Sequence, residues 1–333
     1  MKLLLAAAAV SLPAAALASQ VFGFAIESAA GRNDRLAPVE VGADGLVKYH
    51  SSIEAPPSDA FCNVAFTARS RGGAYFVPAY TLDRSGRQSI LTINATSGAV
   101  LRNVTTSEAI TIPAMAYDDV NGVLYAAGLK TGVRGATVYS IDPATGDTKE
   151  IGSVDGIPDI QLCEAAFSPP TAAQPLGSLI FLYDPLNVSA ADAYVVFDVK
   201  AGKTVNAVIH DGGGLNSITA WAPPGGSGYE LLSMSYLDSR PMELISIQPD
   251  SGASKVILTL PVEGYVPAQG AQAFDEDTGT IWVALGYNDP KNSSFYPVLL
   301  EIDATKTPAT FTQHWLDETK AKAGIWSLWW SSA

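Results

Sequence analysis

Two residues of this chain have side chains suited to acid–base chemistry. Glu164 lies in Leu162-Cys-Glu-Ala-Ala-Phe167 and is the one acid among the polar residues that an internal repeat brings to equivalent places. A carboxylate beside an apolar channel has a raised pKa and can act as a general acid or base; the alternative is a water-linked structural carboxylate. His210 precedes a pliable Gly-Gly-Gly run, where it can act as a base or donate a hydrogen bond to a carbonyl, or stand in an exposed loop.

A second group of residues is suited to holding a ligand. Four tyrosines follow the aromatic anchors of the repeat by 13 to 16 residues, namely Tyr80, Tyr183, Tyr236 and Tyr287. A tyrosine offers an apolar ring with a polar tip, which suits a pocket for a partly aromatic ligand, although tyrosine is also a common packing residue of β-strands. Asn63, Asn216, Gln269 and Trp326 begin the predicted innermost strands. We predict that these eight residues bind an apolar or aromatic small molecule.

The two cysteines, Cys62 and Cys163, occupy the same position in two repeat units that are separated by a third. An oxidising compartment favours a disulfide between them. The bond requires Cα atoms within about 7 Å, and innermost strands two units apart normally lie farther apart than that. The sequence leaves the pairing open.

Metal and cofactor motifs are not found in the sequence. The three histidines, His50, His210 and His314, lie on different repeat units without an acidic cluster around them, so no catalytic metal is predicted. The glycine run after His210 lacks the lysine and the helix of a phosphate loop, and the chain has no nucleophile elbow, zinc-protease helix or nucleotide fingerprint. We therefore predict no cofactor.

These residues owe their placement to a repeat of about 50 residues. The aromatic anchors of the repeat are Phe66, Tyr117, Phe167, Trp221, Phe274 and Trp329. Each anchor ends an apolar segment and is followed by a turn, a second apolar segment and, in most units, an Asp/Asn-x-x-x-Gly turn. Short strands repeated at this period indicate a radial array of β-sheets.

One unit shows how a blade is built. The segments 112–117, 123–127, 136–141 and 148–151 are four predicted strands, separated by turns at 118–122 and 142–146. The N-terminal segments lack an innermost strand, and 324–330 supplies one. We therefore predict an all-β, six-bladed β-propeller whose ring is closed by the C-terminal strand joining the N-terminal blade. The Asp and Gly residues of the turns are interpreted as backbone requirements, not calcium loops.

The ends and the bulk composition suggest an exported protein. Residues 1–18 have a charged start, an apolar run and a small-residue cleavage site, as in a signal peptide, which leaves 19–333 as a single domain. The net charge of −13 argues against nucleic-acid or anionic-membrane partners. The sequence does not predict an oligomeric state. In the secretory lumen or outside the cell, the sequons at Asn94, Asn103, Asn187 and Asn292 are predicted glycosylation sites.

The signal peptide, the six units, the two cysteines and the closing Ile325-Trp-Ser-Leu-Trp-Trp330 resemble secreted fungal propellers distantly related to the senescence-marker/gluconolactonase superfamily. Within it, the pattern resembles the hetero-Diels–Alderases of tropolone–sesquiterpenoid biosynthesis. That resemblance implies a cofactor-free cycloaddition between a quinone methide and a terpene alkene, driven by proximity and a polarising hydrogen bond.

Two other functions remain open. Lactonase-type members of the superfamily bind a divalent metal, and Glu164, Asn63 and Asn216 match part of that ligand set, whereas an acid near Trp326 is missing. The third possibility is a non-catalytic propeller that binds a glycan or a protein. Fold alone does not choose among the three.

Overall fold

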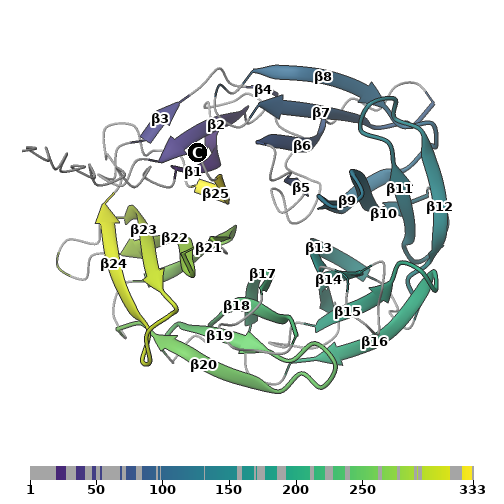
Figure 1. Ribbon diagram of the computed structural model, residues 1–333. Helices are drawn as coiled ribbons and strands as arrows, with labels where there is room; N and C mark the ends of the chain where they lie inside the picture. The colour runs from purple at the N-terminus through teal and green to yellow at the C-terminus, as the bar shows by residue number, and fades with distance from the viewer. Residues whose placement is uncertain are drawn as a thin grey trace, which may run out of the picture.

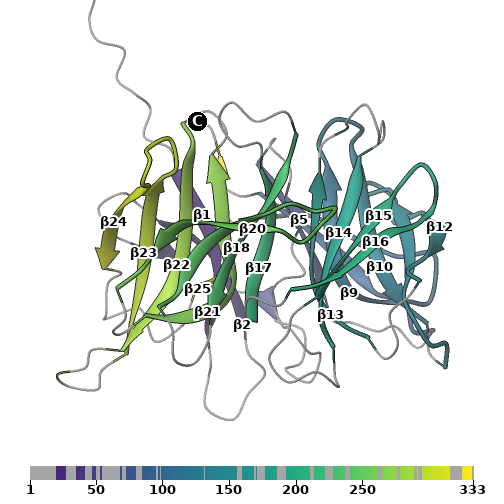
Figure 2. The same ribbon diagram turned by 90° about the horizontal axis from the view of Figure 1, so that it is seen from below.

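The computed structural model contains 25 β-strands arranged in sheets around a centre (Figure 1). The residues it describes are 20–27, 35–41, 47–49, 53–54, 68–69, 73–79, 85–94, 97, 99–130, 132–155, 160–168, 170, 177–185, 193–210, 214–221, 228–236, 241–261, 265–275, 278–288, 291, 295–315 and 325–331. Figure 2 shows the sheets from the side, with the innermost strands running along the central axis. In this part of the chain, no helix has the length and apolarity to cross a bilayer.

Five sheets have four antiparallel strands each, ordered from the centre outward as they follow in the chain. The first consists of β5 (Ala68–Arg69), β6 (Ala74–Ala79), β7 (Ser89–Asn94) and β8 (Val100–Thr105). The second consists of β9 (Thr111–Asp118), β10 (Val123–Leu129), β11 (Thr137–Ile141) and β12 (Thr148–Ser153). The third consists of β13 (Ile160–Ser168), β14 (Ser178–Pro185), β15 (Ala193–Asp198) and β16 (Lys203–Ile209). The fourth consists of β17 (Gly214–Trp221), β18 (Glu230–Tyr236), β19 (Glu243–Ile247) and β20 (Ser254–Thr259). The fifth consists of β21 (Tyr265–Asp275), β22 (Thr280–Asn288), β23 (Phe295–Asp303) and β24 (Thr310–Trp315).

The remaining sheet joins the two ends of the chain and is built differently. It consists of β25 (Ile325–Ser331), β1 (Gln20–Glu27), β2 (Arg35–Val41), β3 (Val47–Tyr49) and β4 (Ile53–Glu54). β25 pairs with β1, while β3 and β4 both pair with β2. We call this five-stranded unit the composite sheet.

The prediction of six blades is wrong, although the all-β propeller fold is confirmed. The structure has five four-stranded blades, not six, together with the composite sheet. The composite sheet contacts the fifth blade through β25 and β21, whereas closure of the ring on the side of the first blade is not confirmed. The repeat overcounted because it treated the two chain ends as halves of an ordinary blade, and the pairing of end strands is decided by tertiary contacts that no local period encodes.

The Asp-to-Gly turns are built from backbone requirements, as predicted. In the turn after β9, the Gly122 N–H donates to the Asp118 carbonyl at 2.8 Å, and Gly122 has a φ of 68°. The buried Asp118 carboxylate accepts the N–H groups of Val120 and Asn121. Asp275 and Gly279 repeat this arrangement after β21. Glycine is favoured at these points because a side chain in left-handed backbone costs free energy.

Neighbouring blades approach each other through glycines on their outer strands and turns. A Cβ atom built on Gly152 of β12 would overlap the carbonyl oxygen of Gly202, in the turn between β15 and β16. A Cβ on Gly252 would lie 2.5 Å from Val208 of β16. A methyl group at Gly152 would meet backbone and one at Gly252 would meet a side chain, so in both places a small residue allows the blades their close spacing.

Apolar clusters fill the space between neighbouring blades. Phe181 and Phe197 of the third blade are fully buried in one cluster with Ala114 and Val138 of the second. The anchors contribute at the same interfaces: Trp221 meets Phe274 of the next blade edge to face, with ring centroids 5.4 Å apart. Each fully buried side chain of this size contributes about 1.5–3 kcal/mol, so the core of the protein lies between the blades.

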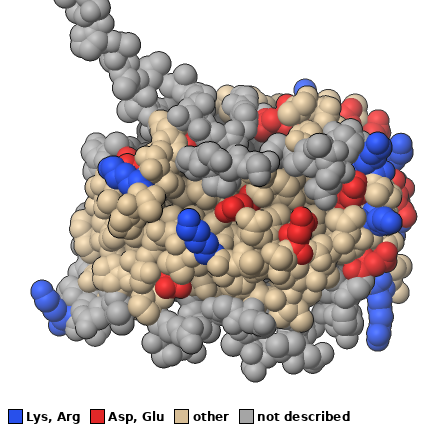
Figure 3. Space-filling view, turned by 60° about the horizontal axis from the view of Figure 1, so that its bottom comes forward, with Lys and Arg blue, Asp and Glu red and all other residues tan. Residues whose placement is uncertain are grey.

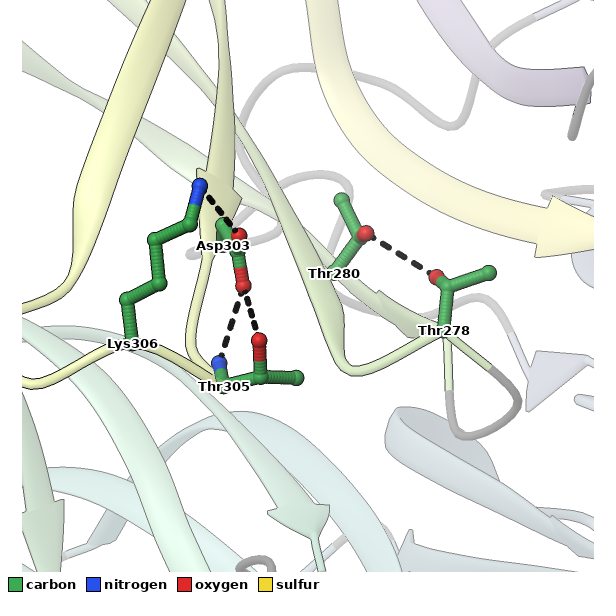
Figure 4. Close-up of polar contacts among 5 residues, drawn as sticks. All are labelled: Thr278, Thr280, Asp303, Thr305 and Lys306. Carbon is green, nitrogen blue, oxygen red and sulfur yellow. Dashed lines mark hydrogen bonds and ion pairs between the residues drawn. The ribbon is translucent and has the colours of Figure 1, made fainter.

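The turn between β23 and β24 is held by an aspartate, and Figure 4 shows its contacts. Asp303 accepts the Thr305 N–H at 3.0 Å and pairs with Lys306 at 2.8 Å. Thr278, in the turn before β22, and Thr280, the first residue of β22, lie across from it. The hydrogen bonds from Lys306 and then from Thr305 lower the pKa of Asp303 from its ordinary 3.8 to about 2.

We predict that this turn weakens only in strong acid. A lowered pKa means that the carboxylate stabilises the fold above about 3.8 and loses that contribution as the pH falls through about 2. An NMR titration of the Asp303 carboxyl should give a midpoint near 2, and Lys306→Met should raise it. A midpoint of 3.8 in the unmodified protein would contradict the assignment.

Candidate functional site

Five of the six described innermost strands, all except β5, share an irregularity a few residues before the aromatic anchor. At that point their pairing with the second strand, or with β1 in the composite sheet, shifts register. The residues at these shifts are Ile112–Pro113 in β9, Cys163 in β13, Ser217–Ile218 in β17, Ala268–Ala271 in β21 and Trp326 in β25. Such bulges redirect side chains and leave backbone groups unpaired, and they are common beside functional sites. We call this set the bulge ring.

Glu164 bridges two members of the bulge ring. It directly follows the bulge of β13, and its Oε2 accepts the backbone N–H of Ile218, in the bulge of β17, at 2.8 Å. The two residues are 54 positions apart in sequence and belong to neighbouring blades. Figure 1 shows β13 and β17 among the strands nearest the centre. The contact fixes a half-buried carboxylate on the innermost layer of the propeller.

An amide makes the corresponding bond elsewhere in the bulge ring. Gln88, before β7, is buried, and its Oε1 accepts the N–H of Ile112, in the bulge of β9, at 2.6 Å. A side chain from the preceding blade therefore satisfies an unpaired bulge N–H in both places, as buried donors require. A carboxylate is not needed for this structural task, because an amide oxygen performs it at Gln88.

The backbone beside Glu164 is unusual. Ser217 has a φ of 66° and is the one non-glycine residue with positive φ in the described part of the chain. Its carbonyl accepts the Ser233 hydroxyl at 2.7 Å. Gln272 of β21 donates to the Leu232 carbonyl at 2.9 Å, and its Oε1 is buried without a hydrogen-bond partner among the residues that the structure describes. Left-handed backbone in a buried serine costs about 1–3 kcal/mol and is concentrated at functional sites.

The predicted tyrosines lie in two different surroundings. Tyr183 of β14 is buried in the cluster between the second and third blades, and burial raises the pKa of its phenol. Tyr287 of β22 packs edge to face against Tyr265 and Trp315, with centroids 5.3 Å apart in each pair. Burial, and next the proximity of Tyr287, raises the pKa of Tyr265. The two tyrosines do not share a cluster.

His210 is buried directly after β16, with 4% of its surface exposed, and is not in an exposed loop. Several other predicted site residues lie on strands, but their side chains are outside the described part of the structure. They are Cys163, Asn216, Tyr236, Gln269 and Trp326. Tyr80, Asn63 and Cys62 lie wholly outside it, so the disulfide and the binding roles of these residues stay predictions. Of the sequons, Asn187 and Asn292 are also outside it, Asn94 ends β7 and Asn103 lies on β8.

Ser217, Gln88 and Gln272, which make the contacts beside the bulge ring, are not among the site residues predicted from the sequence. Gln88 stands in a loop without a motif, and its contact with Ile112 spans 24 residues. Ser217 is a polar residue at the start of a predicted innermost strand, but a positive φ at serine has no local sequence signal. What linked them to Glu164 was the register shift of the inner strands, which depends on pairing between segments.

The described residues do not fit a divalent metal. No group of three or more His, Cys, Asp or Glu side chains within them is placed to hold an ion. Glu164 directly follows a member of the bulge ring, and its Oε2 accepts the Ile218 N–H. A metal centre needs several donors converging on one point, so no metal-dependent step is derived for this site.

The outer surface carries charges of both signs. Figure 3 shows one face on which Asp and Glu side chains are interspersed with Lys and Arg over the described surface. Lys130 and Glu150, for example, pair at 3.5 Å.

Comparisons with known proteins connect the fold to other propellers. A protein-family model described as a repeat of unknown function (DUF6923) matches residues 18–166. No curated protein sequence matches the chain.

Solved structures resemble the chain at low identity. TolB from Acinetobacter baumannii aligns with a TM-score of 0.57 and 12% identity over 93% of this chain, which spans 66% of that protein. A putative 6-phosphogluconolactonase from Bacteroides fragilis has a TM-score of 0.52 and 11% identity, covering 96% of this chain and 100% of its own. The periplasmic gluconolactonase of Pseudomonas aeruginosa aligns with a TM-score of 0.50 and 14% identity. The alignment covers 94% of this chain and 85% of the gluconolactonase. These matches show a distant structural similarity to gluconolactonase-like propellers; a resemblance to hetero-Diels–Alderases is not among the findings.

Proposed function

We propose that this protein is a small-molecule hydrolase that opens a lactone or similar cyclic ester at the bulge ring, with Glu164 as its general base. The observation that carries the proposal is the 2.8 Å hydrogen bond from the Ile218 N–H to Glu164. It holds a carboxylate in fixed orientation on the innermost layer, beside the left-handed Ser217. Two of the structural neighbours are named as lactonases, which suggests the substrate class by analogy.

The chemistry requires only a positioned base and water. Glu164 removes a proton from a water molecule, whose oxygen adds to the lactone carbonyl carbon. The ring C–O bond of the tetrahedral intermediate then breaks, and the proton passes from Glu164 to the departing ring oxygen, giving the open hydroxy acid. A positioned general base contributes about 10²–10⁴-fold to such a rate.

The choice of an acid at position 164 supports a chemical role. Gln88 shows that a neutral amide satisfies a bulge N–H in this fold. A half-buried carboxylate costs more to desolvate than an amide, so its presence is explained more readily by proton transfer than by strand support.

A cofactor-free cycloaddition is the weaker candidate. That reaction needs aromatic rings converging on one pocket, and the two described tyrosines of the predicted set, Tyr183 and Tyr287, lie in different clusters. Non-catalytic binding of a glycan or protein uses the same fold and differs in giving no turnover.

The proposal is tested by incubating the purified protein with a panel of five- and six-membered lactones, including sugar-derived ones, and measuring acid release with a pH indicator. We expect saturable ring opening above the uncatalysed rate, unaffected by a metal chelator. Binding of a lactone detected by calorimetry without any turnover would replace hydrolysis with a binding function. Neither binding nor turnover across the panel would overturn the substrate class.

A further inference from the structure

The outermost strand of the first blade has an exposed aliphatic surface. β8 is the last strand in its sheet and pairs only with β7, and Figure 1 shows it on the outer rim. Val100 and Leu101 are 47% and 59% exposed. An edge strand with exposed aliphatic side chains and unpaired backbone groups invites pairing with other chains.

Asn103 lies on the same strand, within the sequon Asn103-Val-Thr105. Its side chain is exposed and makes no hydrogen bond within the described part of the protein. Side chains alternate along a strand: Val104 packs toward the core and Arg102 reaches Pro143 of the next blade. Asn103 therefore lies on the opposite face from these two. Val100 shares that face, because Asn103 and Val100 pair with Leu91 and Ile93, which are two residues apart on β7, and Leu101 is the extra residue of the bulge beside them.

Other asparagines of the outer strands and turns are engaged in structure. The Oδ1 of Asn94 accepts the N–H and the hydroxyl of Ser97. The Nδ2 of Asn206 on β16 donates to the carbonyls of Pro249 and Asp250. Asn103 is distinguished from both by an exposed amide that has no hydrogen-bond partner among the described residues.

We propose that Asn103 is an N-glycosylation site whose glycan covers the exposed aliphatic surface of β8. The donor is a lipid diphosphate-linked oligosaccharide. The Asn103 Nδ2 forms a bond to the anomeric carbon of the first sugar, the sugar–phosphate bond breaks, the lipid diphosphate leaves, and the amide proton is lost to the transferase. Modification requires export, which the leader-like residues 1–18 predict.

The experiment uses the full chain, expressed in a eukaryotic host and directed to the secretory pathway by its own first residues. Peptide N-glycosidase converts each glycosylated asparagine to aspartate, and peptide mass spectrometry then reads position 103. We expect aspartate at position 103 in most molecules. Asparagine at that position, whether because the chain stays in the cytosol or because the transferase passes it by, would overturn the proposal.

The shielding role is tested with variants of the sequon. N103Q and T105V each remove the acceptor, and we expect a severalfold faster rise in light scattering near growth temperature, with an unchanged circular dichroism spectrum. T105S keeps the sequon and should behave as the unmodified protein, and adding L101K to N103Q should restore solubility. Glycan-free N103Q and T105V that stay as soluble as the unmodified protein would show that the glycan is not a shield. Should N103Q fail to fold, T105V decides the question, since the one side-chain hydrogen bond of Thr105 among the described residues is a 3.5 Å contact with Ser89.

Discussion

Replacing Glu164 by Gln should lower kcat for lactone hydrolysis by roughly 10²- to 10⁴-fold without lowering the melting temperature. The amide oxygen of Gln accepts the Ile218 N–H as the carboxylate does, and Gln88 already makes such a bond to Ile112. An amide, however, takes no proton from water. Steady-state kinetics and thermal unfolding of the same preparation measure both quantities.

Two variants separate catalysis from strand support. Glu164→Ala leaves the Ile218 N–H without its acceptor, so it should lower the free energy of unfolding by about 1–3 kcal/mol as well as abolish turnover. Gln88→Ala removes the corresponding bond at Ile112 and should lower stability to a similar degree while keeping kcat. An E164Q enzyme as active as the unmodified protein would assign Glu164 a purely structural role.

Replacing Gly152 by Ala should lower the free energy of unfolding by more than about 4 kcal/mol, a size reserved for severe steric defects. The new methyl group would overlap the backbone carbonyl of Gly202 in the next blade. A backbone atom cannot move aside as a side chain end can, so β12 and the turn before β16 must separate. Urea denaturation followed by tryptophan fluorescence measures the loss.

Matched glycine variants grade the effect. A Cβ atom at Gly228 would meet no atom within 4 Å. The free energy of unfolding of the Gly228→Ala variant should therefore stay within about 0.5 kcal/mol of that of the unmodified protein. Gly122→Ala meets only the Tyr117 hydroxyl at 3.7 Å but has a φ of 68°, and should cost about 1–2 kcal/mol through its backbone alone. If Gly152→Ala unfolds at the same denaturant concentration as Gly228→Ala, the close approach of the blades is not required for stability.

The local features of the fold could be predicted from the sequence because their causes are local. The turn from Asp118 to Gly122 follows from the hydrogen bonds of one aspartate and the left-handed backbone of one glycine. The innermost strands that end at or beside the anchors Trp221 and Phe274 could be predicted because these aromatic residues recur at a fixed period and end apolar segments. Neither inference needed to know which strands pair.

The errors and omissions arose where distant segments meet. The blade count failed at the composite sheet, where β3 and β4 both pair with β2. Gln88 was passed over because its function lies in a bond to Ile112 of another blade. His210 was left open between a pocket residue and an exposed loop, and its burial comes from neighbours in the fold.

By itself, the sequence determined that this chain is an all-β propeller with structural Asp and Gly turns and an acid at position 164, because periodicity and turn chemistry act over a few residues. Only the tertiary structure decided the number of four-stranded blades, the bulge ring and the bond between Glu164 and Ile218. The physical reason is strand register: one extra residue in an inner strand frees a backbone N–H and redirects a side chain. Which side chain then satisfies that N–H depends on how neighbouring blades pack, and that information is spread over residues far apart in the chain.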